Sequence, residues 1–175
     1  MKILETARLA LREIEVADAP FMLALLNEPS FIENIGDRGV RNLEDAAGYI
    51  ERGAVASYRR NGFGLYLVEL KDGNEPIGIC GLVKRDFLPD VDVGFAFRPQ
   101  YWSRGYAFES ASAVLAYARD VLGITRIVGI TAPDNRGSQN VLRKLGLEFE
   151  KIIETPNAGG QSALFAPKEL PRPKA

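Results

Sequence analysis

The chain has 175 residues, of which 46% are hydrophobic and 26% charged, so it can fold as one soluble domain with a substantial core. Its net charge of −1 provides no basic excess for binding nucleic acid or an anionic membrane. The sequence has no histidine, which excludes Ser-His-Asp and Cys-His catalysis and removes the commonest metal ligand. The single cysteine, Cys80, lies in an apolar run and is expected to be buried. Without a signal-peptide pattern or an apolar run of ~20 residues, we expect a cytoplasmic protein with no nucleic-acid, membrane or metal partner.

The first part of the chain predicts a strand pair followed by two helices. Residues 3–14 alternate apolar and polar side chains, as strands do. Asp18 is a typical helix cap, and Pro29 is expected to end the helix that follows it. Residues 30–41 are polar and glycine-containing, so we expect a loop that either borders a substrate pocket or only connects two helices. The next helix is expected over residues 42–60.

The rest of the chain alternates strands with two further helices. A helix is expected over residues 108–122, and another is expected to open at Ser138 and close at Gly146. The order of elements predicts a single α/β domain over residues 1–168 with mixed strand directions, followed by a flexible tail over 169–175. The expected strands cover residues 63–70, 76–84, 91–97, 124–131, 149–153 and 162–166.

The turn between the strand at 91–97 and the following helix has the clearest functional pattern. The first N–H groups of a helix lack partners within it, and the positive end of the helix dipole points into the turn. Gly105 and Ala107 leave the surface low enough for a phosphate to reach backbone amides, and Arg104 adds a positive charge. This turn therefore predicts a phosphate-binding loop, although a plain loop at the start of a surface helix would show the same pattern.

Three motifs, in this order, make a stronger case than the turn alone. They are ETARLALR at 5–12 followed by Asp18, WSRGYA at 102–107 with Glu109, and Asn135 and Ser138 followed by VLRKLG at 141–146. With these motifs the chain resembles the GNAT superfamily of acyl-CoA-dependent N-acetyltransferases, and within it the ribosomal-protein N-acetyltransferases of the RimJ/RimL type. The resemblance extends from about residue 3 to residue 166.

The chain departs from the superfamily pattern at a few positions. The pyrophosphate-loop pattern is Gln/Arg-x-x-Gly-x-Gly/Ala, and Trp102 stands where most members have Gln or Arg, as is usual in the RimJ/RimL branch. Ser103 stands where glycine is commonest, which is tolerable if its φ stays negative. Leu142 occupies the position of the catalytic tyrosine of many members. Because a hydrocarbon cannot donate a proton, the tyrosine-acid mechanism is not available to this chain.

The resemblance implies a fold and a co-substrate. The fold is a GNAT-like mixed, mostly antiparallel sheet of six to seven strands with about four helices and a splayed central strand pair. The co-substrate is acetyl-CoA, no metal is required, and members are often dimers, so a homodimer is an open expectation. The strand backbone is expected to hold the pantetheine arm, the turn amides the pyrophosphate, and the Asn side chain the pantetheine side of CoA. The implied cofactor-binding residues are Phe95, Ala96, Phe97, Trp102, Ser103, Arg104, Gly105, Tyr106, Ala107, Asn135 and Ser138.

Ser138 and Asp92 are the candidate catalytic residues for attack of a neutral primary amine on the thioester. By resemblance, Ser138 protonates the leaving thiolate, and the alternative is that it only caps its helix. Asp92 lies on the strand expected to face the acetyl group and is a candidate base or water-positioning residue; the alternative is a solvated carboxylate on a strand face. Glu69 and Tyr66 are weaker candidates, and Glu109 is expected to serve the fold.

The sequence leaves the acceptor amine open. A ribosomal-protein N-terminus, a peptide, a polyamine, an amino acid or an antibiotic amine would each fit. An α-amine with a pKa near ~8 is partly neutral at pH 7, so it needs a base less than a lysine amine does. Residues 30–41 and the final hairpin are expected to shape the choice. A non-catalytic acyl-CoA sensor is the alternative function, whereas a nucleotide-binding domain is disfavoured because its phosphate-binding motifs are absent.

Overall fold

A computed structural model describes residues 1–156 and 160–168, so the predicted tail at 169–175 lies outside the described residues. Within these ranges, the strands are β1 (Lys2–Glu5), β2 (Leu9–Glu13), β3 (Leu65–Leu70), β4 (Pro76–Val83), β5 (Val91–Phe97), β6 (Ile127–Thr131), β7 (Leu147–Glu154) and β8 (Gln161–Pro167). The helices are α1 (Ala19–Leu26), α2 (Pro29–Asn34), α3 (Leu43–Ile50), α4 (Ala56–Asn61), α5 (Tyr106–Asp120) and α6 (Arg136–Lys144), with 3-10 segments η1 (Val16–Asp18) and η3 (Pro99–Tyr101) and the π-helical η2 (Glu51–Val55).

The strands form one sheet in the order β1-β2-β3-β4-β5-β6-β8-β7. Over the described ranges this is eight strands rather than the six to seven that the resemblance implied, and both strands of the pair expected at 3–14 belong to the sheet. All neighbouring pairs are antiparallel except β5 and β6. The predicted mixed, mostly antiparallel sheet is therefore confirmed.

The central strands β5 and β6 part soon after they meet. Their parallel pairing covers only Val91 with Ile127 and Asp92 with Val128, after which β6 continues beside β8. The rest of β5 thus has β4 on one side only, and the expected splayed strand pair is found here. Backbone groups on the open side of β5 are left to other partners.

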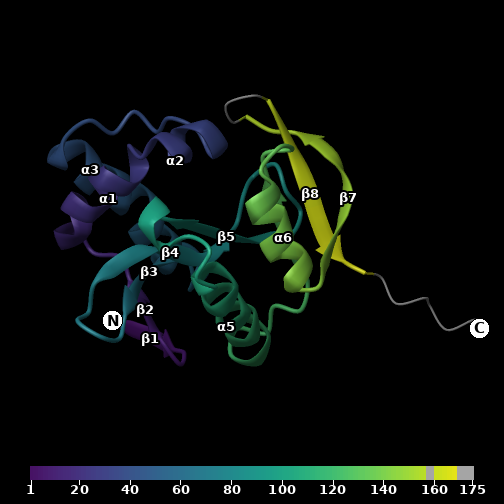
Figure 1. Cartoon of the computed structure of the whole chain (residues 1–175), viewed down its shortest axis with the longest axis horizontal. Helices are drawn as coiled ribbons and strands as arrows, with labels where there is room; N and C mark the ends of the chain where they lie inside the picture. The colour runs from purple at the N-terminus through teal and green to yellow at the C-terminus, as the bar shows by residue number, and fades with distance from the viewer. Residues whose placement is uncertain (157–159, 169–175) are drawn as a thin grey trace, which may run out of the picture.

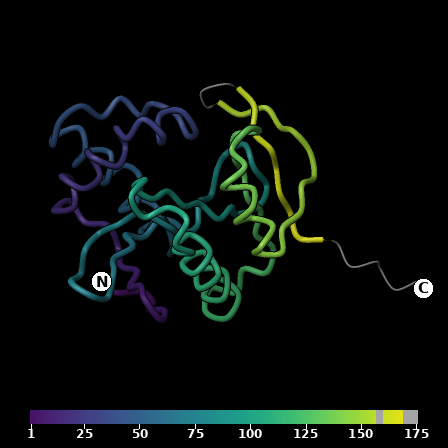
Figure 2. Tube along the Cα trace, viewed as in Figure 1, coloured from purple at the N-terminus to yellow at the C-terminus, as the bar shows by residue number. Residues whose placement is uncertain are grey.

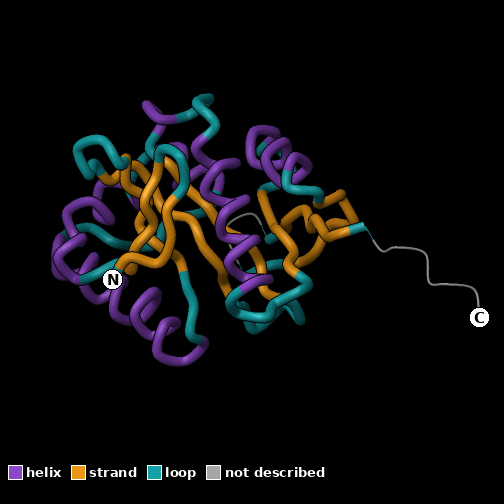
Figure 3. Tube along the Cα trace, turned by 90° about the horizontal axis from the view of Figure 1, so that it is seen from below, coloured by secondary structure: helices purple, strands orange, loops and turns teal. Residues whose placement is uncertain are grey.

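Helices cover both faces of the sheet because its strands alternate their side chains between two cores. On β3, Val68 belongs to the core beneath α5 and α6, whereas Leu67 belongs to the core beneath α1, α2 and α3. On β4, Cys80 belongs to the core beneath α5 and α6, and Ile79 belongs to the core beneath α1, α2 and α3. Figure 3 shows the strands running between helices, and Figures 1 and 2 show α5 and α6 between the N-terminal helices and the β7–β8 hairpin. Cys80 is fully buried, as predicted, and burial raises the pKa of its thiol to about 12.

The segment at 30–41 differs from expectation, because its first part is helical. Pro29 does not end α1, which stops at Leu26; it stands in the first turn of α2, where a missing N–H costs no hydrogen bond. Phe31 is 6% exposed and packs into the core beneath α1 and α3, which gives α2 its hydrophobic anchor. The expected helix at 42–60 is confirmed as α3, η2 and α4 running on continuously, so α2 is the helix that sequence reasoning missed.

Candidate active site

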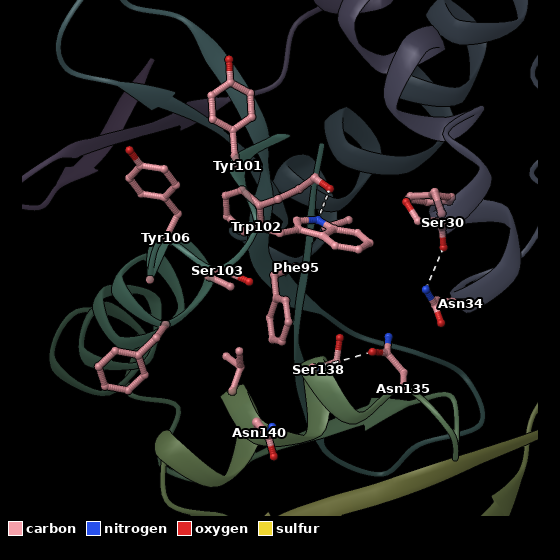
Figure 4. A pocket seen from close by; sticks show the side chains of 18 of the residues that line it. Ser30, Asn34, Phe95, Tyr101, Trp102, Ser103, Tyr106, Asn135, Ser138 and Asn140 are labelled. Carbon is pink, nitrogen blue, oxygen red and sulfur yellow. Dashed lines mark hydrogen bonds between the residues drawn. The ribbon is translucent and has the colours of Figure 1, made fainter. Parts of the chain in front are cut away.

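A cavity of about 420 Å³ lies where the C-terminal end of β5 meets the first turns of α5 and α6, with α2 along one side. The side chains of these four elements converge on it in Figure 4. Of the expected cofactor-binding residues, all but Arg104 line this cavity; they are Phe95, Ala96, Phe97, Trp102, Ser103, Gly105, Tyr106, Ala107, Asn135 and Ser138. Arg104 belongs to the same turn but is exposed outside the cavity lining.

The first turn of α5 opens at this cavity. Gly105 is the N-cap residue, with a φ of +82°, and its carbonyl accepts the first helical hydrogen bond, from the Glu109 N–H at 2.9 Å. The amides of Tyr106, Ala107 and Phe108 therefore precede the helical ladder. These three residues line the cavity, so the positive end of the α5 dipole faces it.

Ser103 adopts a backbone conformation that sequence reasoning did not expect. Its φ is +59°, in the left-handed region that favours glycine, so the condition under which serine would be tolerated without strain, a negative φ, is not met. A non-glycine residue there costs roughly 1 kcal/mol. The conformation follows from the turn that carries the chain from η3 into α5, and it explains why glycine is common at this position.

Trp102 has a structural function that its sequence position did not reveal. The indole Nε1–H donates a hydrogen bond of 2.8 Å to the carbonyl oxygen of Phe97. This bond pins the turn onto the end of β5. The Arg98 N–H donates to the Ile77 carbonyl of β4. Because residues of an antiparallel strand alternate between bonding their neighbour and facing away from it, the N–H and C=O groups of Phe95 and Phe97 face away from β4, toward the space between β5 and β6. The Phe97 carbonyl is thus already occupied, which leaves its N–H and the backbone of Phe95 for a ligand.

Glu109 braces the first turn of α5 against the β1–β2 turn. Its carboxylate accepts hydrogen bonds from the Thr6 hydroxyl at 2.6 Å, the Arg8 N–H at 2.9 Å and Arg8 Nε at 2.7 Å. Burial alone would raise the pKa of Glu109, but hydrogen bonds from Thr6 and Arg8 lower it below its ordinary value. The Arg8 guanidinium also lies 4.4 Å from the ring centre of Tyr106. These contacts support the structural function expected for Glu109.

The start of α6 places Ser138 differently from the sequence expectation. The helix begins at Arg136 and its cap is Asn135, whose Oδ1 accepts a hydrogen bond of 3.2 Å from the Ser138 N–H. The expectation that Ser138 opens the helix, and the alternative that it only caps it, are therefore both wrong. Figure 4 shows the Ser138 hydroxyl pointing into the cavity, between Phe95 and Asn135.

A second cavity, of about 150 Å³, adjoins the first between the parted strands β5 and β6. The two cavities share residues of β5, of the start of α6 and of the α2 region, so they meet between these elements, with Ser138 at the junction; the shared lining residues are Phe31, Asn34, Ile35, Phe95, Ala96, Asn135 and Ser138. Asp92 lines the second cavity only. The structure thus divides the two candidate catalytic residues between the junction and the second cavity.

Asp92 is buried, with 1% of its surface exposed, so the alternative of a solvated carboxylate is wrong. Its partner is Arg85, whose Nε donates to the carboxylate at 3.1 Å. Burial raises the pKa of Asp92 to about 6 even though Arg85 acts to lower it. A carboxylate with this pKa can take up and release a proton near neutral pH, as a general base must.

Glu69 and Tyr66 lie away from both cavities, so the structure does not place them with the other candidates. Glu69 accepts a hydrogen bond of 2.9 Å from Arg12, which also pairs with Asp18. Tyr66 is 1% exposed and stacks on Tyr58 with ring centres 5.7 Å apart. Both belong to β3, which β4 separates from β5.

Several residues that line the cavities gave no sequence signal. Ser30 and Asn34 come from α2, where Asn34 Nδ2 donates to the Ser30 carbonyl at 3.0 Å, and Lys144 comes from the last turn of α6. Residues from the segment at 30–41 and Gln161 and Ser162 of the final hairpin line the second cavity. Both segments therefore line a cavity, and their function in substrate choice stays a prediction.

Residues 8–148 match the family model described as the acetyltransferase (GNAT) domain. Because this match covers most of the chain, the chain belongs to the GNAT family and is an acetyl-CoA-dependent N-acetyltransferase. The uncharacterized N-acetyltransferase YoaA of Bacillus subtilis (strain 168) is 29% identical over 152 residues, which are 86% of this chain and 85% of YoaA.

Solved structures show the same fold. An acetyltransferase from Agrobacterium tumefaciens str. C58 has a TM-score of 0.79 at 24% identity, with 97% of this chain and 95% of that chain covered. RimL, a ribosomal L7/L12 alpha-N-protein acetyltransferase in complex with coenzyme A, has a TM-score of 0.81 at 17% identity, with 95% and 97% covered. At these identities the likeness concerns the fold alone. Among the described helices, none combines the length and the apolar character that crossing a membrane requires.

Proposed function

We propose that the protein transfers the acetyl group of acetyl-CoA to a primary amine by direct attack within a ternary complex. The observation that carries this proposal is the junction of two cavities at Ser138, one facing the dipole of α5 and the other facing Asp92. Two substrates bound one in each cavity would meet at this junction. Positioning of this kind supplies much of the rate enhancement of a two-substrate reaction.

The first cavity suits the diphosphate and pantetheine parts of CoA. The amides of residues 103–107 would hold the diphosphate at the positive end of α5. The free backbone groups of Phe95 would bind the pantetheine amides as an added strand does and orient the thioester oxygen toward an N–H donor. Asn135 would contact the pantetheine from the α6 side, since its Oδ1 caps the helix and its Nδ2 has no hydrogen-bond partner within residues 1–156 and 160–168.

The second cavity suits the amine and its proton. The amine nitrogen forms a bond to the thioester carbonyl carbon, and the carbon–sulfur bond breaks. Asp92 would take the proton that the amine loses, directly or through a water, because its pKa of about 6 leaves it ionised at neutral pH. Ser138 would donate a proton to the departing thiolate and regain one from solvent, while Asp92 releases its proton to solvent, so that free CoA thiol and an amide are the products.

Membership of the RimJ/RimL branch, and with it a ribosomal-protein acceptor, stays a proposal. The structural likeness to RimL, whose name gives a ribosomal protein as its substrate, supports a protein α-amine as one candidate acceptor. The charges of the second cavity favour a different candidate, which is developed below.

The test is release of free thiol from acetyl-CoA in the presence of a panel of primary amines. We expect amine-dependent release that falls about 10²- to 10⁴-fold in Asp92→Asn. CoA binding in that variant should be unchanged, because Asp92 does not line the first cavity. Binding of CoA without any amine-dependent thiol release would instead support the acyl-CoA sensor.

A further inference from the structure

The second cavity contains an arginine whose charge the proposed transfer does not use. Arg38 follows α2 and lines this cavity, and its Nε is buried without a hydrogen-bond partner among residues 1–156 and 160–168. A buried donor that stays unpaired is costly, and a ligand that accepts from it would remove that cost. The unpaired Nε therefore marks a place where a ligand atom with a lone pair would bind.

The chain around Arg38 is held in place by its neighbours. Asp37 accepts hydrogen bonds of 2.9 Å from the Gly39 N–H and from Nη1 of Arg41, so its carboxylate is engaged on the solvent side. The Val40 carbonyl accepts from Asn27 at 2.8 Å. Arg38 thus projects from an ordered turn, and the adjacent acidic side chain already has its own partners.

The charges of the cavity do not balance. Among its described lining residues, the ionisable side chains with a charge at neutral pH are Arg38, Arg85 and Asp92. Arg85 and Asp92 form an ion pair, so among the described lining residues no negative charge remains to compensate that of Arg38. The remaining polar lining residues, Gln161 and Ser162 among them, are neutral. A cavity of about 150 Å³ with one uncompensated guanidinium favours a small anionic group.

We propose that the acceptor is a small amine that carries a carboxylate, as an amino acid does, and that Arg38 binds this carboxylate. The inference rests on the proposed transfer and adds the substrate class. The linings give the orientation: the amine lies toward Ser138 and Asp92, and the carboxylate lies toward Arg38, which lines the second cavity only. A planar guanidinium matches a carboxylate with paired hydrogen bonds. A polyamine would place a second positive charge beside Arg38 and be repelled.

The test compares acceptors that differ only at the carboxylate. Leucine, leucinamide, isoamylamine and spermidine are assayed by thiol release from acetyl-CoA with the natural chain, Arg38→Gln and Arg38→Lys. When kcat/KM is expressed per concentration of neutral amine, we expect the value for leucine to exceed those for leucinamide and isoamylamine by about 10- to 100-fold. Arg38→Gln should abolish this preference by lowering kcat/KM for leucine to about that for isoamylamine, and Arg38→Lys should keep part of it. The exposed Arg60, which lines neither cavity, provides the matched control Arg60→Gln.

Two kinds of result would overturn the carboxylate inference alone, and a third would overturn the proposed transfer as well. Equal use of leucine and isoamylamine, or a preference for spermidine, overturns the carboxylate inference and leaves acetyl transfer standing. A uniform loss with every acceptor in Arg38→Gln, with CoA binding intact, makes Arg38 structural and also overturns it. If no amine, including N-terminal peptides, releases thiol while CoA binds, the proposed transfer fails and the inference fails with it.

Discussion

Replacing Gly105 with glutamate places a negative charge where the diphosphate of CoA is proposed to bind. With a φ of +82°, Gly105 tolerates a side chain only at a cost of roughly 1 kcal/mol of stability. A Cβ there would lie 3.3 Å from Nη2 of Arg8, close but at the end of a flexible side chain. The fold should therefore survive the substitution.

The effect on CoA is expected to be much larger than the effect on the fold. A carboxylate about 5 Å from one phosphate charge is repelled by about 3 kcal/mol at an effective dielectric constant of about 20. This corresponds to a dissociation constant at least about 100-fold weaker. Calorimetric titration with CoA measures this change directly, and a thermal melt of the same sample reports whether the chain is folded.

Gly123, which follows the other end of α5, offers a matched control. Its φ is +70° and a Cβ there would meet nothing within 4 Å, so Gly123→Glu carries the same backbone strain and charge away from the cavity. We expect Gly123→Glu to lose similar stability and to bind CoA normally. A CoA affinity for Gly105→Glu within about threefold of that of Gly123→Glu would refute a diphosphate site at the start of α5.

Three further predictions concern the turn and Asp92. Ser103→Gly should raise the free energy of unfolding in urea by about 0.5–1 kcal/mol by removing left-handed strain; unchanged stability would show that the strain is absent. Glu109→Gln should cost about 1–2 kcal/mol in the same assay, because it weakens the charge-assisted bonds from Arg8; a loss below about 0.3 kcal/mol would contradict the brace. The pKa of Asp92 is raised to about 6, so protonation below that pH removes the proposed base. The plot of log kcat/KM against pH should therefore steepen below about pH 6 in the natural chain but keep one slope, set by the amine, in Asp92→Asn; identical profiles would exclude Asp92 as the base.

The sequence predicted well the features that depend on local patterns. Glycine at 105 after a strand, followed by apolar residues at helical spacing, was enough to predict a turn before α5 that could hold a phosphate. The other lining residues that the sequence analysis named came from the resemblance to the GNAT superfamily. The pattern of Asn135 and Ser138 identified the start of α6, but it assigned the cap to the wrong residue. Both Asn and Ser are good caps, and local sequence alone does not separate them.

The features that sequence reasoning missed depend on contacts between distant segments. Pro29 can end one helix or begin the next. It begins α2 here because a helical segment at this point buries Phe31 against α1 and α3. Asp92 alternates along β5 as an exposed residue would, yet β6 and Arg85 bury it. Arg38 had no motif at all, because its significance comes from the charges of a cavity that several distant parts of the chain enclose.

A crystal structure with CoA tests the central claim most directly. Our account predicts the diphosphate within hydrogen-bond distance, about 3 Å, of amides in residues 103–107, with the sulfur beside Ser138 and Phe95 where the two cavities meet. Finding CoA elsewhere, or the protein's own side chains filling the first turn of α5, would contradict it.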